Sequence, residues 1–169
     1  MTIPPDLRIA TATVADAQAI AALRTSVAEH LTALHGRGHW SSCATERGVL
    51  RGLSTLRVLV ARSAAGIVAT LRLAPKKPWA IDRAYFASVP RPLYLLDMAV
   101  EPVLRGRGVG RRLLAEAETV ARLWPADAIR LDAYDGPAGA GAFYRKCGYR
   151  EVGCVIYRGV PLVYFERLL

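Results

Sequence analysis

The feature that most constrains this chain is the stretch Arg105–Gly110, in which three glycines fall within five positions. Glycine has no Cβ, so such a stretch can turn tightly and bring its backbone close to a ligand. The apolar run Leu93–Val100 precedes it and predicts a buried strand, which Pro102 ends. From Val109 to Trp124, apolar residues recur at steps of three and four, which predicts a helix.

The glycines therefore lie where a strand passes into the first turn of a helix. Free N–H groups and the positive end of the helix dipole favour an anion there, most often a phosphate. Positive charge is added by Arg105, Arg107, Arg111 and Arg112. No Lys-Ser/Thr pair follows the glycines, which excludes a P-loop, and Arg111 stands where a dinucleotide fingerprint needs its third glycine. A glycine-rich turn with solvated arginines is the remaining alternative.

Two motifs resemble those of the GCN5-related N-acetyltransferase (GNAT) family. The pattern R-x-x-G-x-G at residues 105–110 resembles the motif with which that family holds the pyrophosphate of acetyl-CoA. The segment Ala142–Gly153 resembles the family's late A-x-x-F/L-Y-x-K-x-G-F signature, and it follows a second apolar strand, Ala128–Tyr134. The resemblance covers about Leu56–Leu169, and the earlier part of the chain matches only in its coarse pattern.

The resemblance implies which residues would bind acetyl-CoA as a cosubstrate. The pantetheine arm would insert where the strands Leu93–Val100 and Ala128–Tyr134 separate. Backbone N–H groups at Met98 and Val100 would hold the arm and polarise the thioester carbonyl, and those of Arg105–Gly110 would hold the pyrophosphate. The residues expected to contact the cosubstrate are Met98, Ala99, Val100, Arg105, Gly106, Arg107, Gly108, Val109, Gly110, Arg111, Phe143 and Lys146.

The resemblance also implies a proton donor, whereas the base has several candidates. Tyr144 occupies the position at which the family commonly donates a proton to the CoA thiolate, and its alternative role is a packed aromatic. Asp97, in the strand that leads to the site, is the first candidate for the general base, and its alternative role is an ion pair with an arginine. His39 and Glu101 are weaker candidates. The late motif departs from the family at Pro137, where an asparagine usually contacts the pantetheine arm.

Length and charge limit the classes of function. A chain of 169 residues predicts one domain, here a single N-acetyltransferase domain over 1–169. The net charge of +9 comes from 23 basic and 14 acidic residues, and only Lys76, Lys77 and Lys146 among the basic ones are lysines. The arginines are scattered except at the glycine turn, which favours a polyanionic cofactor over nucleic acid.

The cellular compartment and the partners are predicted from the absence of certain sequence patterns. No window is long and uncharged enough for a membrane span, and the first ten residues show no signal-peptide pattern. Cys43, Cys147 and Cys154 have no metal-ligand spacing, so we expect reduced thiols that are buried or inert. We predict a cytoplasmic protein, monomer or homodimer, that binds no metal, nucleic acid or membrane.

The coarse order of elements is β α α β β β α β α β β, which predicts an α/β protein of GNAT-like fold. A central βαβ unit would lie within a mostly antiparallel mixed sheet flanked by helices. The expected strands are Leu7–Ala12, Leu56–Arg62, Ile67–Leu73, Leu93–Val100, Ala128–Tyr134, Arg150–Tyr157 and Val160–Arg167. The expected helices are one that Thr13 and Asp16 cap and Gly36 ends, and then Ala44–Leu53, Val109–Trp124 and Ala138–Lys146.

These observations predict an acetyl-CoA-dependent N-acetyltransferase. An acetyl group would move to a primary amine of a small molecule or peptide by direct attack in a ternary complex. Two alternatives remain, a CoA-binding module without turnover that acts as a sensor or partner, and a basic nucleic-acid-associated protein that keeps the fold.

Overall fold

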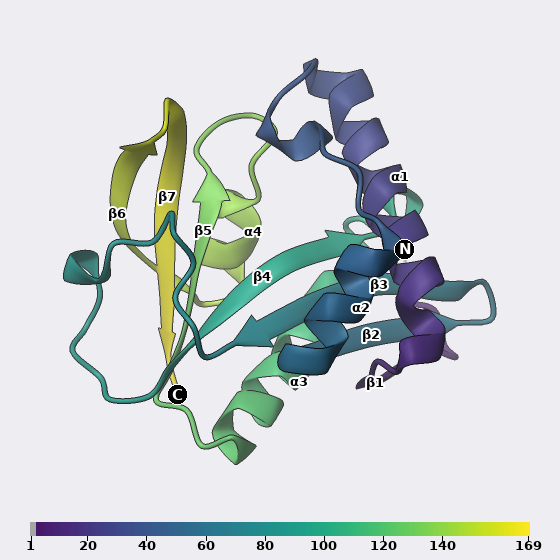
Figure 1. The fold of residues 1–169 in the computed structure, drawn as a ribbon, viewed down its shortest axis with the longest axis horizontal. Coiled ribbons are helices and arrows are strands. Elements are labelled where there is room, and N and C mark those ends of the chain that lie inside the picture. The colour runs from purple at the N-terminus through teal and green to yellow at the C-terminus, as the bar shows by residue number, and fades with distance from the viewer. Residues whose placement is uncertain (1–2) are drawn as a thin grey trace. The chain divides into compact units, whose positions relative to one another are not determined.

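The computed structural model describes residues 3–169, and its strands form one mixed sheet of order β1-β2-β3-β4-β5-β7-β6 (Figure 1). The strands are β1 (Arg8–Thr11), β2 (Arg57–Ser63), β3 (Gly66–Ala74), β4 (Pro92–Val100), β5 (Ala128–Tyr134), β6 (Arg150–Tyr157) and β7 (Val160–Leu168). The helices are α1 (Ala17–His35), α2 (Glu46–Thr55), α3 (Val109–Leu123) and α4 (Gly141–Lys146). The predicted fold class and the order of elements are confirmed.

Internal contacts divide the chain into two compact units. The first takes in the chain up to Leu73 together with Leu96–Ala117, and the second comprises Ala74–Leu95 with Glu118–Leu169. Each unit is described by itself below. The single domain over 1–169 stays a prediction.

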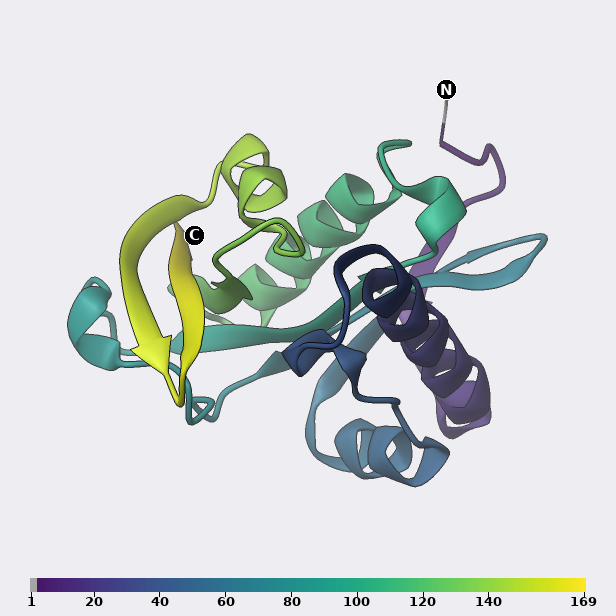
Figure 2. The same ribbon diagram turned by 90° about the horizontal axis from the view of Figure 1, so that it is seen from above.

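The first unit begins with β1 and α1, and the residues that cap the helix were predicted from the sequence. The Thr13 N–H donates to Asp16 Oδ2 at 2.7 Å, as expected of a capping pair, and Arg62 Nη2 lies 2.6 Å from the same oxygen. Helix α1 ends at Gly36, which adopts a positive φ of 77° as a C-terminal cap. Figure 2 shows α1 and α2 on one face of β1–β3.

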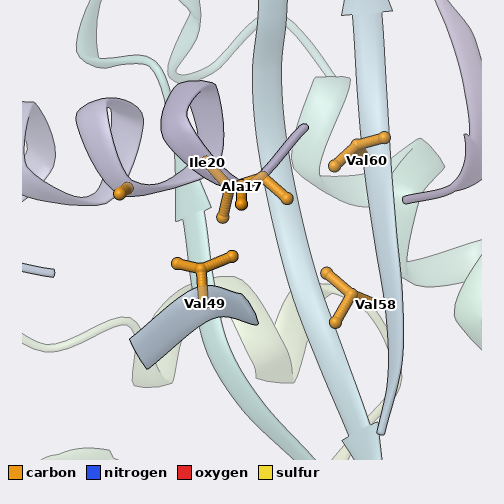
Figure 3. Close-up of a cluster of buried hydrophobic side chains, with 6 residues drawn as sticks. Ala17, Ile20, Val49, Val58 and Val60 are labelled. Carbon is orange, nitrogen blue, oxygen red and sulfur yellow. The ribbon is translucent and has the colours of Figure 1, made fainter. Parts of the chain in front are cut away.

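The core of the first unit is aliphatic. Buried residues of α1 recur at helical spacing and pack on α2 and on β2 (Figure 3). This cluster consists of Ala17, Ile20, Ala21, Val49, Val58 and Val60. A second cluster, Leu23, Val27 and Ala99, packs α1 against the end of β4. The helix is thus fixed to the sheet along most of its length.

The second unit contains the parallel pairing that the βαβ prediction requires. The start of β4 pairs with β5 in parallel from Pro92↔Ala128 to Tyr94↔Arg130. Strand β7 then pairs antiparallel with both β5 and β6. One core cluster of this unit is largely aromatic, and in it Ile81 and Phe86 of the long β3–β4 loop pack on Tyr94 and Tyr164.

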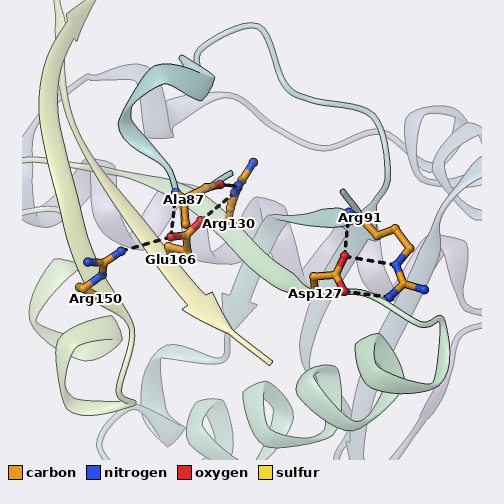
Figure 4. A network of polar contacts seen from close by, with 6 residues as sticks. All are labelled: Ala87, Arg91, Asp127, Arg130, Arg150 and Glu166. Carbon is orange, nitrogen blue, oxygen red and sulfur yellow. Dashed lines mark hydrogen bonds and ion pairs between the residues drawn. The ribbon is translucent and has the colours of Figure 1, made fainter. Parts of the chain in front are cut away.

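A buried ion pair fixes the same loop to the sheet (Figure 4). Arg130 Nε lies 2.9 Å from Glu166 Oε2, and the two side chains are 2% and 0% exposed. Arg130 also donates to the carbonyl of Ala87, whose N–H donates to Glu166 Oε1 at 3.2 Å. Arg150 Nη2 lies 3.4 Å from that oxygen. Both charges therefore have several partners inside the protein.

Several sequence expectations differ from the structure. Helix α4 starts at Gly141 instead of Ala138, because the chain first makes a turn in which a Cβ on Gly139 would collide with the Tyr134 carbonyl. Cys43 and Cys154 are exposed and Cys147 is half-buried, so burial is ruled out for the first two, and that these thiols are inert stays a prediction. None of the helices in the described part of the chain combines the length and apolarity that a membrane crossing requires.

Candidate functional site

The glycine turn of the first unit connects the end of β4 to α3. The Glu101 N–H donates to the Val68 carbonyl of β3 at 2.8 Å, which fixes the point where the turn begins. A single turn of 3₁₀-helix at Pro102–Leu104 follows. Gly106 and Gly108 then adopt positive φ values of 73° and 84°, in the region that favours glycine.

The turn presents a set of backbone donors at the start of α3. The N–H groups of Gly106, Gly108, Val109, Gly110 and Arg111 donate to no other backbone group within residues 3–169. The Gly108 carbonyl accepts from Arg112 N at 3.0 Å, which starts the helical hydrogen bonding. Free N–H groups at a helix N-terminus, with nearby arginines, form an environment that favours an anion.

Gly108 is restricted by space as well as by conformation. A Cβ at this position would lie 3.1 Å from Cγ1 and Cδ1 of Ile3. Any other residue would therefore be strained in its backbone and would also press on the N-terminal segment. At Gly106 a Cβ would meet nothing within 4 Å, so only its conformation limits substitution.

Asp97 lies in β4, directly before the expected contact residues Met98, Ala99 and Val100. Its Oδ1 is 2.9 Å from Arg24 Nη2 of α1, and its Oδ2 pairs with Arg72 Nη2 of β3. Burial lowers the pKa of Arg24, and the charge of Asp97 opposes that shift. The alternative role considered for Asp97, an ion pair with an arginine, is what the structure contains. A role as the base stays a prediction.

Tyr144 lies on α4 in the second unit, and its residue surface is only 6% exposed. Its ring contacts those of Phe143, Tyr149 and Phe165, with centroids 5.2–5.9 Å apart. Burial raises the pKa of Tyr144 far above its usual value, and the nearby Asp132 raises it further. The hydroxyl therefore keeps its proton at neutral pH and is a weaker acid than a free tyrosine, so it is better suited to donate a hydrogen bond than to give up its proton.

A comparison with protein families decides the identity of the chain. The acetyltransferase (GNAT) domain model matches residues 54–151, which is more than half of the sequence and includes both the glycine turn and α4. The chain belongs to the GNAT acetyltransferase family. This confirms the resemblance and the prediction of an acetyltransferase. Among curated proteins, no sequence matches this chain.

Solved structures show the GNAT fold over nearly the whole chain. A ribosomal-protein-alanine N-acetyltransferase from Brucella melitensis is 24% identical, with a TM-score of 0.73, covering 96% of this chain and 99% of that one. An acetyltransferase from Salmonella typhimurium, solved with acetyl-CoA, is 19% identical, with a TM-score of 0.69 and coverage of 97% and 94%. The PaiA N-acetyltransferase of Thermoplasma acidophilum, solved with coenzyme A, is 14% identical, with a TM-score of 0.72 and coverage of 96% and 99%.

The predicted site residues of this GNAT acetyltransferase fall into two groups. Those from Asp97 to Arg111 lie in the first unit, within one strand, one turn and the start of one helix. Phe143, Tyr144 and Lys146 lie on α4 in the second unit, where Tyr144 is buried and Lys146 is exposed. Their assignments to cosubstrate binding or catalysis stay predictions.

Sequence reasoning missed the two arginines that pair with Asp97. Arg24 and Arg72 are far from it in the sequence, and neither belongs to a motif. Of the weaker base candidates, His39 is exposed with its ring 5.1 Å from that of Trp40, and Glu101 is half-buried. Within residues 3–169, no three His, Cys, Asp or Glu side chains gather closely enough to hold a metal ion.

Proposed function

We propose that this GNAT acetyltransferase moves an acetyl group from acetyl-CoA to a primary amine by direct attack in a ternary complex. The observation that carries the proposal is the set of N–H groups of the glycine turn, at the start of α3, that donate to no other backbone group within residues 3–169. The Salmonella and Thermoplasma structures contain acetyl-CoA and coenzyme A, respectively, on the same fold. Their ligands support acetyl-CoA as the cosubstrate here.

The glycine turn fits a pyrophosphate in both shape and charge. Gly106 and Gly108 adopt left-handed conformations and carry no Cβ, so neither residue has a side chain that could block the approach of an anion. Arg105 and Arg111 are exposed beside these donors, and Arg107 is half-buried with an Nε that has no hydrogen-bond partner within residues 3–169. Such donors and charges bind phosphate oxygens through charge-assisted hydrogen bonds. We infer that residues 105–111 hold the pyrophosphate of acetyl-CoA.

The remaining residues would act on the reacting atoms. Bound acetyl-CoA supplies a thioester, in which a C–N bond forms to the amine as the C–S bond breaks. Backbone N–H groups of Met98 and Val100 would polarise the thioester carbonyl. The Tyr144 hydroxyl would donate its proton, or a hydrogen bond, to the departing thiolate. The proton released by the amine would pass to solvent water.

Two measurements on the unmodified protein test the proposal. Acetyl-CoA should raise the melting temperature through binding linkage, and an oligonucleotide should not. A panel of amines should then contain an acceptor that makes the protein release free CoA. The panel includes a peptide that begins with alanine, because of the name of the Brucella neighbour. A protein that binds acetyl-CoA but releases no CoA with any amine would be a binding module.

The variant Tyr144→Phe tests the proton donor. The ring keeps its contacts, so the domain should fold and bind acetyl-CoA normally. We expect kcat to fall by roughly 10²–10⁴-fold, the contribution of a positioned proton donor, with the Kd of acetyl-CoA unchanged. Steady-state kinetics and calorimetry measure the two quantities separately. A kcat within about twofold of the parent, too small a change for such a donor, would leave Tyr144 with a packing role alone.

A further inference from the structure

Asp97 has a backbone conformation that is unusual for a residue inside a strand. Its φ is 51°, although it lies inside β4. The other non-glycine residue with a positive φ within residues 3–169 is Arg158, which precedes Gly159 in the β6–β7 hairpin turn, where this conformation is common. A left-handed residue within a strand is strained and persists only where its surroundings hold it.

Two arginines from different elements hold this residue. Arg24 reaches Asp97 from α1, and Arg72 reaches it from β3. The Arg72 guanidinium in turn lies against α2, since a Cβ on Gly52 would be 2.8 Å from its Nη1. The three charged side chains are each about one-quarter exposed, at 26%, 25% and 24%. Charges that are partly withdrawn from water interact more strongly than fully exposed ones.

We propose that Asp97 is a positioning residue which, with Arg24 and Arg72, holds the left-handed bend that directs Met98–Val100. Under the proposed function, on which this inference rests, that segment contacts the reactive end of acetyl-CoA. In this proposal Asp97 positions the segment and does not act as the general base, since each of its oxygens forms an ion pair with a guanidinium group. A base needs an oxygen that can take the proton of the amine.

A matched pair of substitutions separates a positioning role from a chemical one. Asp97→Gly and Asp97→Ala both remove the carboxylate and both leave Arg24 and Arg72 without it. They differ in backbone preference, because glycine adopts the left-handed region freely and alanine does not. We expect kcat of the glycine variant to exceed that of the alanine variant by roughly tenfold. Equal and nearly complete loss in both variants would overturn the proposal.

Removing either arginine provides the second test. Arg24→Met and Arg72→Met keep the carboxylate but release the bend, and a small misplacement of reacting groups can cost about 10²-fold in rate. We expect a lower kcat with an unchanged Kd for acetyl-CoA and an unchanged pH profile. If Asp97 were the base, these variants would keep or raise kcat, and Asp97→Asn would remove the acidic limb of the profile.

One measurement tests the left-handed bend at Asp97 without depending on catalysis. Amide hydrogen exchange of Met98–Val100 should be faster in Asp97→Ala than in Asp97→Gly, because only alanine disfavours the bend. Equal exchange in the two variants would overturn the proposal. If the unmodified protein neither binds nor consumes acetyl-CoA, the proposed function fails, and the exchange measurement still decides whether the two arginines and Asp97 hold this segment.

Discussion

The two units of the molecule differ in how completely their most buried ion pairs are withdrawn from water. The first has an aliphatic core, and the ion pairs Arg62–Asp16, Arg24–Asp97 and Arg72–Asp97 all stay partly exposed. The second buries the whole Arg130–Glu166 pair and packs tyrosine side chains against other aromatic rings. Because a buried polar group is costly without a partner and a part-exposed one is not, the units should respond differently to the loss of a single polar atom.

The largest expected loss of stability follows a substitution of Glu166. Glu166→Gln leaves the buried Arg130 without its counter-charge, which typically costs about 3–5 kcal/mol. Denaturant unfolding measures the loss. The control is Asp127→Asn, which removes the more exposed pair with Arg91 in the same unit (Figure 4) and should cost far less. Equal losses in the two variants would show that burial does not set the cost.

Asp16 tests a part-exposed pair in the first unit. Burial alone would raise the pKa of Asp16, but hydrogen bonds from Arg62 and Thr13 outweigh it and hold the pKa below its usual value. Asp16→Asn should therefore cost about 1–2 kcal/mol at neutral pH, as loss of a helix cap does.

The pH dependence of this loss follows from the direction of the shift. A lowered folded-state pKa stabilises the protein above the unfolded value of ~3.9, and the stabilisation is lost as pH falls through the folded value. The difference between the parent and Asp16→Asn should thus shrink as the pH is lowered into that range. A difference that does not change with pH would contradict the assigned charge.

The smallest expected effect on stability is an increase and not a loss. The Tyr149 hydroxyl is buried and has no hydrogen-bond partner within residues 3–169. Tyr149→Phe should raise stability by about 1 kcal/mol, because it removes an unsatisfied polar group. Tyr164→Phe is the control, since its hydroxyl accepts from Asp82 N at 3.1 Å and donates to the Ala80 carbonyl. That variant should lose stability, so two variants of the same kind should shift the melting temperature in opposite directions.

Structure that depends on neighbouring residues could be predicted from the sequence, and structure that depends on distant residues could not. The elements of the first unit follow from periodicity and from capping residues such as Thr13 and Gly36, which are local signals. The Arg130–Glu166 pair joins residues 36 positions apart, and no local pattern indicates such a contact. The glycine turn was predicted because its chemistry lies within six consecutive residues. The pairing of Asp97 with Arg24 and Arg72 was not, because it depends on how α1 and β3 pack.

The most direct test of the central claim is the affinity for acetyl-CoA of a Gly108→Val variant. A Cβ there forces the backbone out of the left-handed region and blocks the approach of the pyrophosphate. Gly66→Val is the matched control, since Gly66 also has a positive φ, of 101°, and a Cβ there would meet nothing within 4 Å. Calorimetry should find no acetyl-CoA binding to folded Gly108→Val and the parent affinity in Gly66→Val. Unchanged affinity in Gly108→Val would show that the glycine turn is not the binding site.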